Sequence, residues 1–174
     1  MDDLNTDIIF VLNSDEADED STVLTSGCIN ILRERKRRKS ELCNDAVFMY
    51  GKNAPAEKLQ GCRELQDVSD TLLNTMKKAV EYALESENQG RTVFVICGDQ
   101  GLRTHIDRGD ISTLIKRGEK EHNWEFMFIA RDFSLHTLLK ELKISNLAYI
   151  RHGGGRNSTR TALSLMKNML AAEV

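Results

Sequence analysis

Five short runs of almost uninterrupted apolar residues constrain the fold of this chain more than any other feature. Each run has the length of a strand, and continuous apolar character is typical of strands that are buried on both faces. Between the runs, apolar residues recur at the spacing of amphipathic helices. This alternation predicts a mainly parallel sheet that is covered by helices on both faces. The runs are residues 7–12, 45–50, 92–97, 124–130 and 147–150, and the helices are centred on residues 24–32, 72–84, 111–115, 135–142 and 162–170.

A sixth strand is expected at residues 56–62, which are more polar and weakly alternating, as in an edge strand. The step from Tyr50 to Glu57 is too short for a crossover connection, so it predicts a hairpin and an antiparallel edge. The expected fold is therefore α/β: a doubly wound, Rossmann-like, six-stranded sheet with one antiparallel edge strand. A chain of 174 residues suits a single domain, 1–174, that buries a core without covalent links.

The cysteines and the first residues indicate the compartment. Cys28, Cys43, Cys62 and Cys97 form no C-x-x-C pair, and no histidine lies at zinc-site spacing from them. Cys97 lies within an apolar run, which predicts a buried free thiol. The chain begins Met-Asp-Asp, without the basic stretch of a signal peptide, and no apolar run is long enough for a membrane span. We expect a cytoplasmic protein with free thiols and no membrane partner.

Polar residues follow the predicted strands at the edge where α/β proteins bind ligands. Ligands lie outside the C-terminal ends of parallel strands, close to the point where the strand order reverses. Asn13 and Asp15 follow the first run, Asp99 follows the run at 92–97, and Asp70 precedes the second helix. All four residues offer hard oxygen ligands. Such a set predicts a site for Mg²⁺, Mn²⁺ or Ca²⁺.

Four segments of the chain together form a recognisable set: FVLNSDEA at 10–17, VSDTLL at 68–73, VFVICGDQ at 93–100 and NWEFMFIA at 123–130. They resemble the von Willebrand factor A domain, of the intracellular kind found in bacteria and phages. That family carries D-x-S-x-S after its first strand, a threonine before a later helix and an aspartate after its fourth strand. The likeness covers roughly residues 6 to 150. It implies a metal-ion-dependent adhesion site, in which an acidic residue of a partner protein completes the coordination of the ion.

The chain departs from the family at most of the ligand positions. Asn13 stands where the family has aspartate, Asp15 and Ala17 replace its two serines, and Asp70 stands at the threonine position, with Ser69 or Thr71 there in a shifted alignment. Asp99 matches the family directly. Three carboxylates around one point repel each other unless an ion or protons neutralise them. Two interpretations follow: a divalent-cation site with a rewritten ligand set, or a relic whose acidic residues are solvated.

Two charged features lie outside this set. The basic run from Arg33 to Lys39 suits the C-terminal end of a helix, and it could also form an anion or nucleic-acid patch. No aromatic residue interleaves with it and the net charge is −3, so nucleic acid is not the expected partner. The second feature precedes the last helix and is either a weak anion-binding loop or a capped, flexible connection. It consists of Gly153, Gly154, Gly155, Arg156 and Arg160.

Three functions remain open. The first is a non-enzymatic binding module that uses a divalent cation, held by Asn13, Asp15, Asp70 and Asp99, to bridge an unidentified protein partner. The second is a metal-dependent enzyme acting on phosphate-containing substrates, although the sequence offers no nucleophile with an evident base. The third is a metal-free scaffold or oligomer subunit. We predict no catalytic residues.

Overall fold

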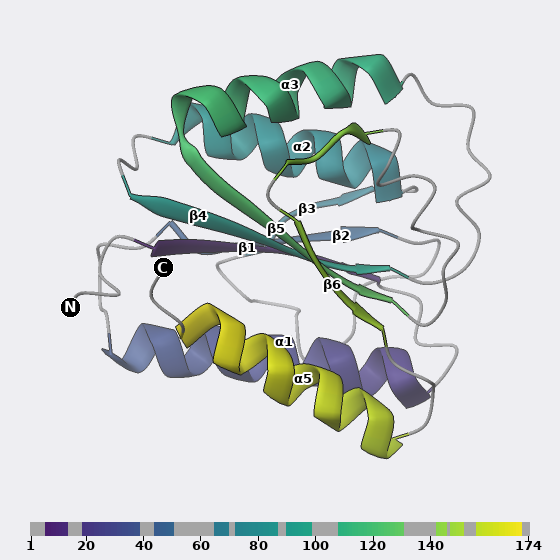
Figure 1. Ribbon diagram of the computed structural model, residues 1–174. Coiled ribbons are helices and arrows are strands. Elements are labelled where there is room, and N and C mark those ends of the chain that lie inside the picture. Colours follow the sequence, from purple (N-terminus) through teal and green to yellow (C-terminus); the bar gives the residue numbers. More distant parts are fainter. Residues whose placement is uncertain are drawn as a thin grey trace.

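The structure of the protein is a computed structural model with a sheet between two layers of helices (Figure 1). It describes residues 6–13, 19–38, 44–50, 65–69, 72–86, 90–98, 108–130, 142–145, 147–151 and 156–171. The predicted α/β class is confirmed, with a Rossmann-like parallel sheet that has helices on both faces.

Five parallel strands form the body of the sheet, in the order β2-β1-β4-β5-β6. All five coincide closely with the apolar runs. Four of them, β1, β2, β4 and β5, are almost entirely buried, because strands that are covered on both faces carry few polar residues, whereas β6 lies at an edge and is only partly buried. A short further strand, β3, lies beside β2 at the edge of the sheet. The strands are β1 Thr6–Asn13, β2 Ala46–Tyr50, β3 Leu65–Ser69, β4 Arg91–Gly98, β5 Asn123–Ala130 and β6 Leu147–Arg151.

The prediction of an antiparallel edge strand is wrong. Every pair of strands in the described part of the chain is parallel, including β2 with β3. Residues 56–62, where that strand was expected, lie outside the described residues. The connection from β2 to β3 spans residues 51–64, which is long enough to return to the start of the sheet and permits a parallel neighbour.

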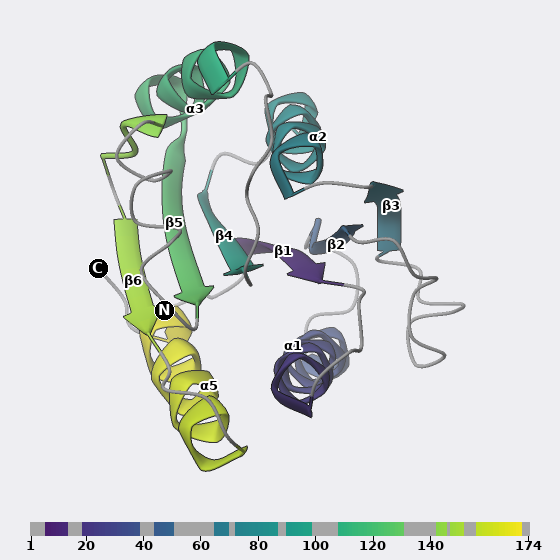
Figure 2. The same cartoon turned by 90° about the vertical axis from the view of Figure 1, so that its right-hand side faces the viewer.

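Of the helices that the structure describes, two cover each face of the sheet (Figures 1 and 2). The connections β1 to β2 and β4 to β5 move in opposite directions across the sheet. Right-handed crossovers therefore place their helices on opposite faces. Helices α1 Glu19–Arg38 and α5 Arg156–Ala171 share one face, and α2 Leu72–Glu85 and α3 Arg108–Glu121 share the other. None of the described helices is long and apolar enough to cross a membrane.

Alternate residues of each central strand build two separate cores. Ile8, Phe10 and Leu12 of β1 pack in the core with α1 and α5, whereas Ile9 and Val11 pack in the core with α2 and α3. The period of two along a strand produces this division. The predicted helix at 135–142 lies outside the described residues, apart from the buried Leu142.

Candidate functional site

The strand order reverses between β1 and β4, and this reversal defines the candidate functional site. The pairings Asn13↔Tyr50 and Val11↔Ile96 align the C-terminal ends of β2, β1 and β4 along one edge. The helices that follow β1 and β4, α1 and α3, lie on opposite faces of the sheet. In open α/β sheets the point of reversal is the place where ligands bind.

The side chain of Tyr50 is held at this edge by a hydrogen bond to β4. Its hydroxyl donates a hydrogen bond of 2.7 Å to the carbonyl oxygen of Cys97 in a buried environment. Because β1 lies between β2 and β4, the phenol side chain spans the end of β1, beside Asn13. The bond holds together the two strands that flank β1 where the order reverses.

Helix α2 begins at the same edge. The hydroxyl of Thr75, in the first turn, donates to the carbonyl oxygen of Met49 at 3.4 Å and so links the helix to the end of β2. Helix α2 has no acidic residue in its first turn. The positive end of its dipole therefore favours carboxylates supplied by neighbouring residues.

Two buried thiols lie beneath the site on the face of the sheet that α1 covers. Cys28 of α1 and Cys97 of β4 are both free cysteines and both buried, as predicted for Cys97. The hydrogen bond with Cys97, together with burial and the proximity of that second thiol, raises the pKa of Cys28 well above its usual value. A neutral, buried thiol is a poor nucleophile and metal ligand, so Cys28 has a packing role. Cys43 and Cys62 lie outside the described residues.

The described residues include one of the four predicted metal ligands. Asn13 lies half-buried at the end of β1. Asp15, Asp70 and Asp99 lie outside the described residues, although Asp70 directly follows β3 and Asp99 directly follows β4 in the sequence. Within the described ranges, no group of three or more His, Cys, Asp or Glu residues could hold a metal ion.

The predicted anion-binding loop is described only where it enters helix α5. Arg156 is the first residue of the helix, and Arg160 lies exposed one turn later. Gly153, Gly154 and Gly155 lie outside the described residues.

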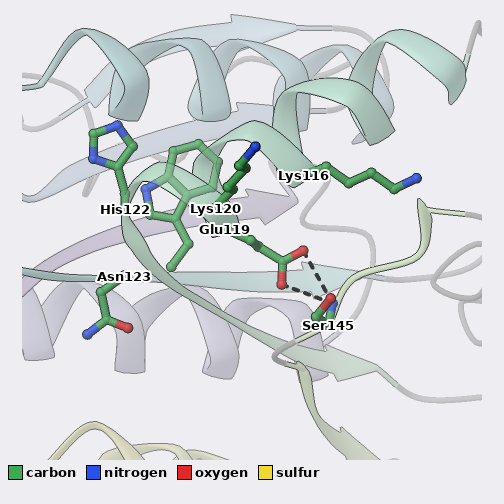
Figure 3. Close-up of a pocket in the computed structure, with 7 residues that line it drawn as sticks. Lys116, Glu119, Lys120, His122, Asn123 and Ser145 are labelled. Atoms are coloured by element: carbon green, nitrogen blue, oxygen red, sulfur yellow. Dashed lines mark hydrogen bonds between the residues drawn. The ribbon is translucent and has the colours of Figure 1, made fainter.

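A pocket of about 420 Å³ lies at the opposite edge of the sheet, where β5 begins (Figure 3). The carboxylate of Glu119 accepts hydrogen bonds of 2.9 and 3.3 Å from the backbone N–H of Ser145. The imidazole of His122 stacks on the indole of Trp124, with ring centroids 6.0 Å apart. The residues that line the pocket are Lys116, Glu119, Lys120, His122, Asn123, Trp124 and Ser145.

Most of the residues that line this pocket are polar or charged. Trp124 is only 3% exposed, so it offers little aromatic surface to a ligand. The pocket lies at the C-terminal end of α3, where the negative end of the helix dipole partly offsets the positive charge of Lys120. Among the lining residues, the Glu119 carboxylate accepts a hydrogen bond from the backbone N–H of Ser145.

No pattern in the sequence indicates the Tyr50–Cys97 bond or the pocket. The two bonded residues are 47 positions apart, and the pocket combines the end of α3, the start of β5 and Ser145. The one available hint was the position of Tyr50 as the last residue of an apolar run. Comparison of the chain with protein-family models and with curated proteins finds no match.

Proposed function

We propose that this protein is a non-enzymatic binding module of the von Willebrand factor A type, which holds a divalent cation at the β1/β4 edge to bridge a partner protein. The observation that supports this proposal is the reversal of strand order between β1 and β4, with Asn13 at the end of β1. This edge is where a Rossmann-like sheet binds its ligand.

The four proposed ligands suit a hard cation. Asn13 would supply an amide oxygen, and Asp15, Asp70 and Asp99 would supply carboxylates. When bound, the ion would neutralise the three carboxylates and accept one further oxygen ligand from the partner. Tyr50 would act as a positioning residue, because its bond to Cys97 fixes β4 two residues before Asp99.

The parallel edge strand favours this ligand set. Because β3 runs parallel to β2, its last residue, Ser69, pairs with Tyr50 at the same edge as Asn13. An antiparallel β3 would end at the opposite edge of the sheet. Asp70 follows Ser69 directly in the sequence. A parallel β3 therefore ends at the edge of the proposed site, one residue before Asp70.

Thermal unfolding in chelator, and then with Mg²⁺, Mn²⁺ or Ca²⁺, tests the cation site. An ion at about a hundred times its dissociation constant stabilises the folded state by roughly 2.7 kcal/mol. For a chain of this length we expect Tm to rise by roughly 5–10 °C. Asp99→Ala should abolish the rise, whereas Glu81→Ala, on the exposed side of α2, should keep it. A wild-type Tm that no ion changes would make the site a relic.

Restoring the aspartate of the family provides a gain-of-function test. Asn13→Asp adds a fourth carboxylate to the set, and cation affinity rises with the charge of the ligands. We expect tighter binding of Mg²⁺ or Mn²⁺ by isothermal titration calorimetry. The matched control is Asn30→Asp on the exposed side of α1, which makes the same change of charge away from the edge. Equal affinities of both variants and the wild type would count against Asn13 as a ligand.

A display library of peptides tests the bridging role. We expect the wild-type protein to enrich peptides that share a carboxylate when Mg²⁺ is present. A chelator should abolish this enrichment, and so should the Asp99→Ala substitution. Turnover of generic phosphoesters or nucleotides with Mg²⁺ or Mn²⁺, lost in the same variant, would instead identify a metal-dependent enzyme.

A further inference from the structure

Helices α1 and α5 lie side by side and run in the same direction across one face of the sheet (Figures 1 and 2). They approach closely at Gly27 of α1 and Leu163 of α5, where a Cβ added to Gly27 would lie 2.5 Å from Cδ1 of Leu163. The two helices therefore form one continuous surface, although they are more than a hundred positions apart in sequence.

This surface is strongly basic. Helix α5 contains three basic residues and no acidic residue, and α1 ends in a run with five basic residues between 33 and 38. Arg35 is not available to a ligand, because it is turned inward to Asp45 and to the carbonyl oxygen of Thr6. Four other side chains are exposed and have no carboxylate partner among the described residues. We call Arg33, Arg37, Arg160 and Lys167 the basic face.

These four residues are distributed along the pair of helices. Arg160 and Lys167 lie three residues before and four residues after Leu163, so they are on the flank of α5 that adjoins α1. Arg33 and Arg37 lie one turn apart on the open side of α1. With a rise of 1.5 Å per residue, the four cations extend over about 20 Å along the helix pair.

We propose that the basic face binds the phosphate backbone of double-stranded nucleic acid. A duplex presents a phosphate about every 3.4 Å along each strand, so a surface of about 20 Å meets several of them. No exposed residue of α1 or α5 in the described part of the chain is aromatic, and single strands gain affinity mainly by stacking on aromatic side chains. The composition therefore favours a duplex over a single strand.

The exposed apolar residues of α5 argue against a protein or membrane partner for this face. Leu165 and Met169 are 49% and 36% exposed, but both lie on the flank of α5 that is turned away from α1. A protein partner anchors on apolar groups at the centre of its interface, and membrane adsorption combines cations with apolar residues on one side. On the flank of α5 that carries its cations, the basic face has no such exposed apolar residue in the described part of the helix.

Binding to short duplexes of DNA and of RNA, measured by fluorescence anisotropy between about 50 and 200 mM salt, tests the proposal. The double variant Arg160→Glu/Lys167→Glu should bind the preferred duplex at least about tenfold more weakly, and the slope of log affinity against log salt should fall by about two. All substituted residues are exposed, and circular dichroism verifies folding. The two duplexes distinguish DNA from RNA as the source of the phosphates.

Two matched variants make the test specific. Lys116→Glu/Lys120→Glu on α3 changes the net charge equally but lies on the opposite face, so it should leave binding unchanged. Glu34→Gln removes the exposed acidic residue of the α1 run and should tighten binding. Equal weakening by the two double variants, no binding at about 50 mM salt, or stronger binding to polyglutamate or anionic vesicles than to either duplex would overturn the proposal. None of these variants touches the proposed cation ligands.

Discussion

The hydroxyl of Tyr50 lies 2.7 Å from the carbonyl oxygen of Cys97, and this bond joins the last residue of β2 to β4 over the end of β1. The bond places a polar group inside an otherwise apolar core, where an unpaired carbonyl is costly. It also lies at the reversal of strand order on which the proposed function depends.

We expect Tyr50→Phe to lower the free energy of unfolding by about 1 kcal/mol, because the Cys97 carbonyl loses its side-chain donor. Urea unfolding measures the change. The control is Tyr82→Phe, which removes an exposed bond of 3.4 Å to the carbonyl oxygen of Asn44 and should cost less. Equal losses in the two variants would show that burial adds nothing to the Tyr50 bond.

Gly118 of α3 packs directly against Trp124 of β5. A Cβ at position 118 would lie 2.0 Å from Cζ3 of the indole. The ring is confined by Phe94, whose centroid is 5.0 Å away, and by the stacked His122. We expect Gly118→Ala to destabilise the fold by about 3 kcal/mol, as overpacking does in a rigid core.

Gly27→Ala is the matched control for Gly118→Ala. The nearest atoms to its Cβ are the ends of the flexible Leu163 side chain, and alanine improves helix propensity by about 1 kcal/mol. Chemical unfolding should therefore give a much smaller loss than for Gly118→Ala. A larger loss at Gly27 would contradict the rigid packing inferred around Trp124.

Arg35 and Asp45 form an ion pair whose side chains are only 13% and 10% exposed. The Asp45 carboxylate also accepts a hydrogen bond of 2.8 Å from the backbone N–H of Ile8. We expect Asp45→Asn to lower the free energy of unfolding by about 2–3 kcal/mol, because it leaves the guanidinium partly buried without its counter-charge. Glu121→Gln, which breaks the exposed pair with Arg117, should cost less than about 0.5 kcal/mol. Similar losses in both variants would contradict this assignment.

The raised pKa of Cys28 predicts a loss of stability at alkaline pH. Above about pH 8.5 the unfolded chain releases this thiol proton while the folded protein keeps it, so the free energy of unfolding falls as pH rises. Urea unfolding at several pH values between about 7 and 9.5 measures the slope, below the range where Tyr82 titrates. Cys28→Ala should be less stable at neutral pH but should have a smaller slope. An unchanged slope would exclude Cys28 as its source.

Strands β1, β2, β4 and β5 were predictable because burial on both faces removes polar residues from them, and β6 was predictable from its short apolar run at residues 147–150. The edge strand was not: β3 has the sequence LQDVS, which carries no such pattern. The pairing of β3 depends on the free edge of β2 and on the length of the connection from β2 to β3. Neither property can be recognised in the sequence of residues 65–69. Reading residues 56–62 as a strand produced the wrong, antiparallel edge.

Some features of the candidate site likewise follow from the sequence, and others follow only from the tertiary structure. The sequence by itself determined the α/β class, the strands whose ends define the ligand edge, and the position of Asn13 at the end of β1, because local hydrophobic periodicity encodes these features. Only the tertiary structure decided that Tyr50 reaches Cys97, that the end of α3 meets Ser145, and that α1 and α5 lie side by side with Gly27 against Leu163. Contacts of this kind join residues far apart in the chain, and they arise when helices and strands pack together to bury the apolar faces that the sequence specifies.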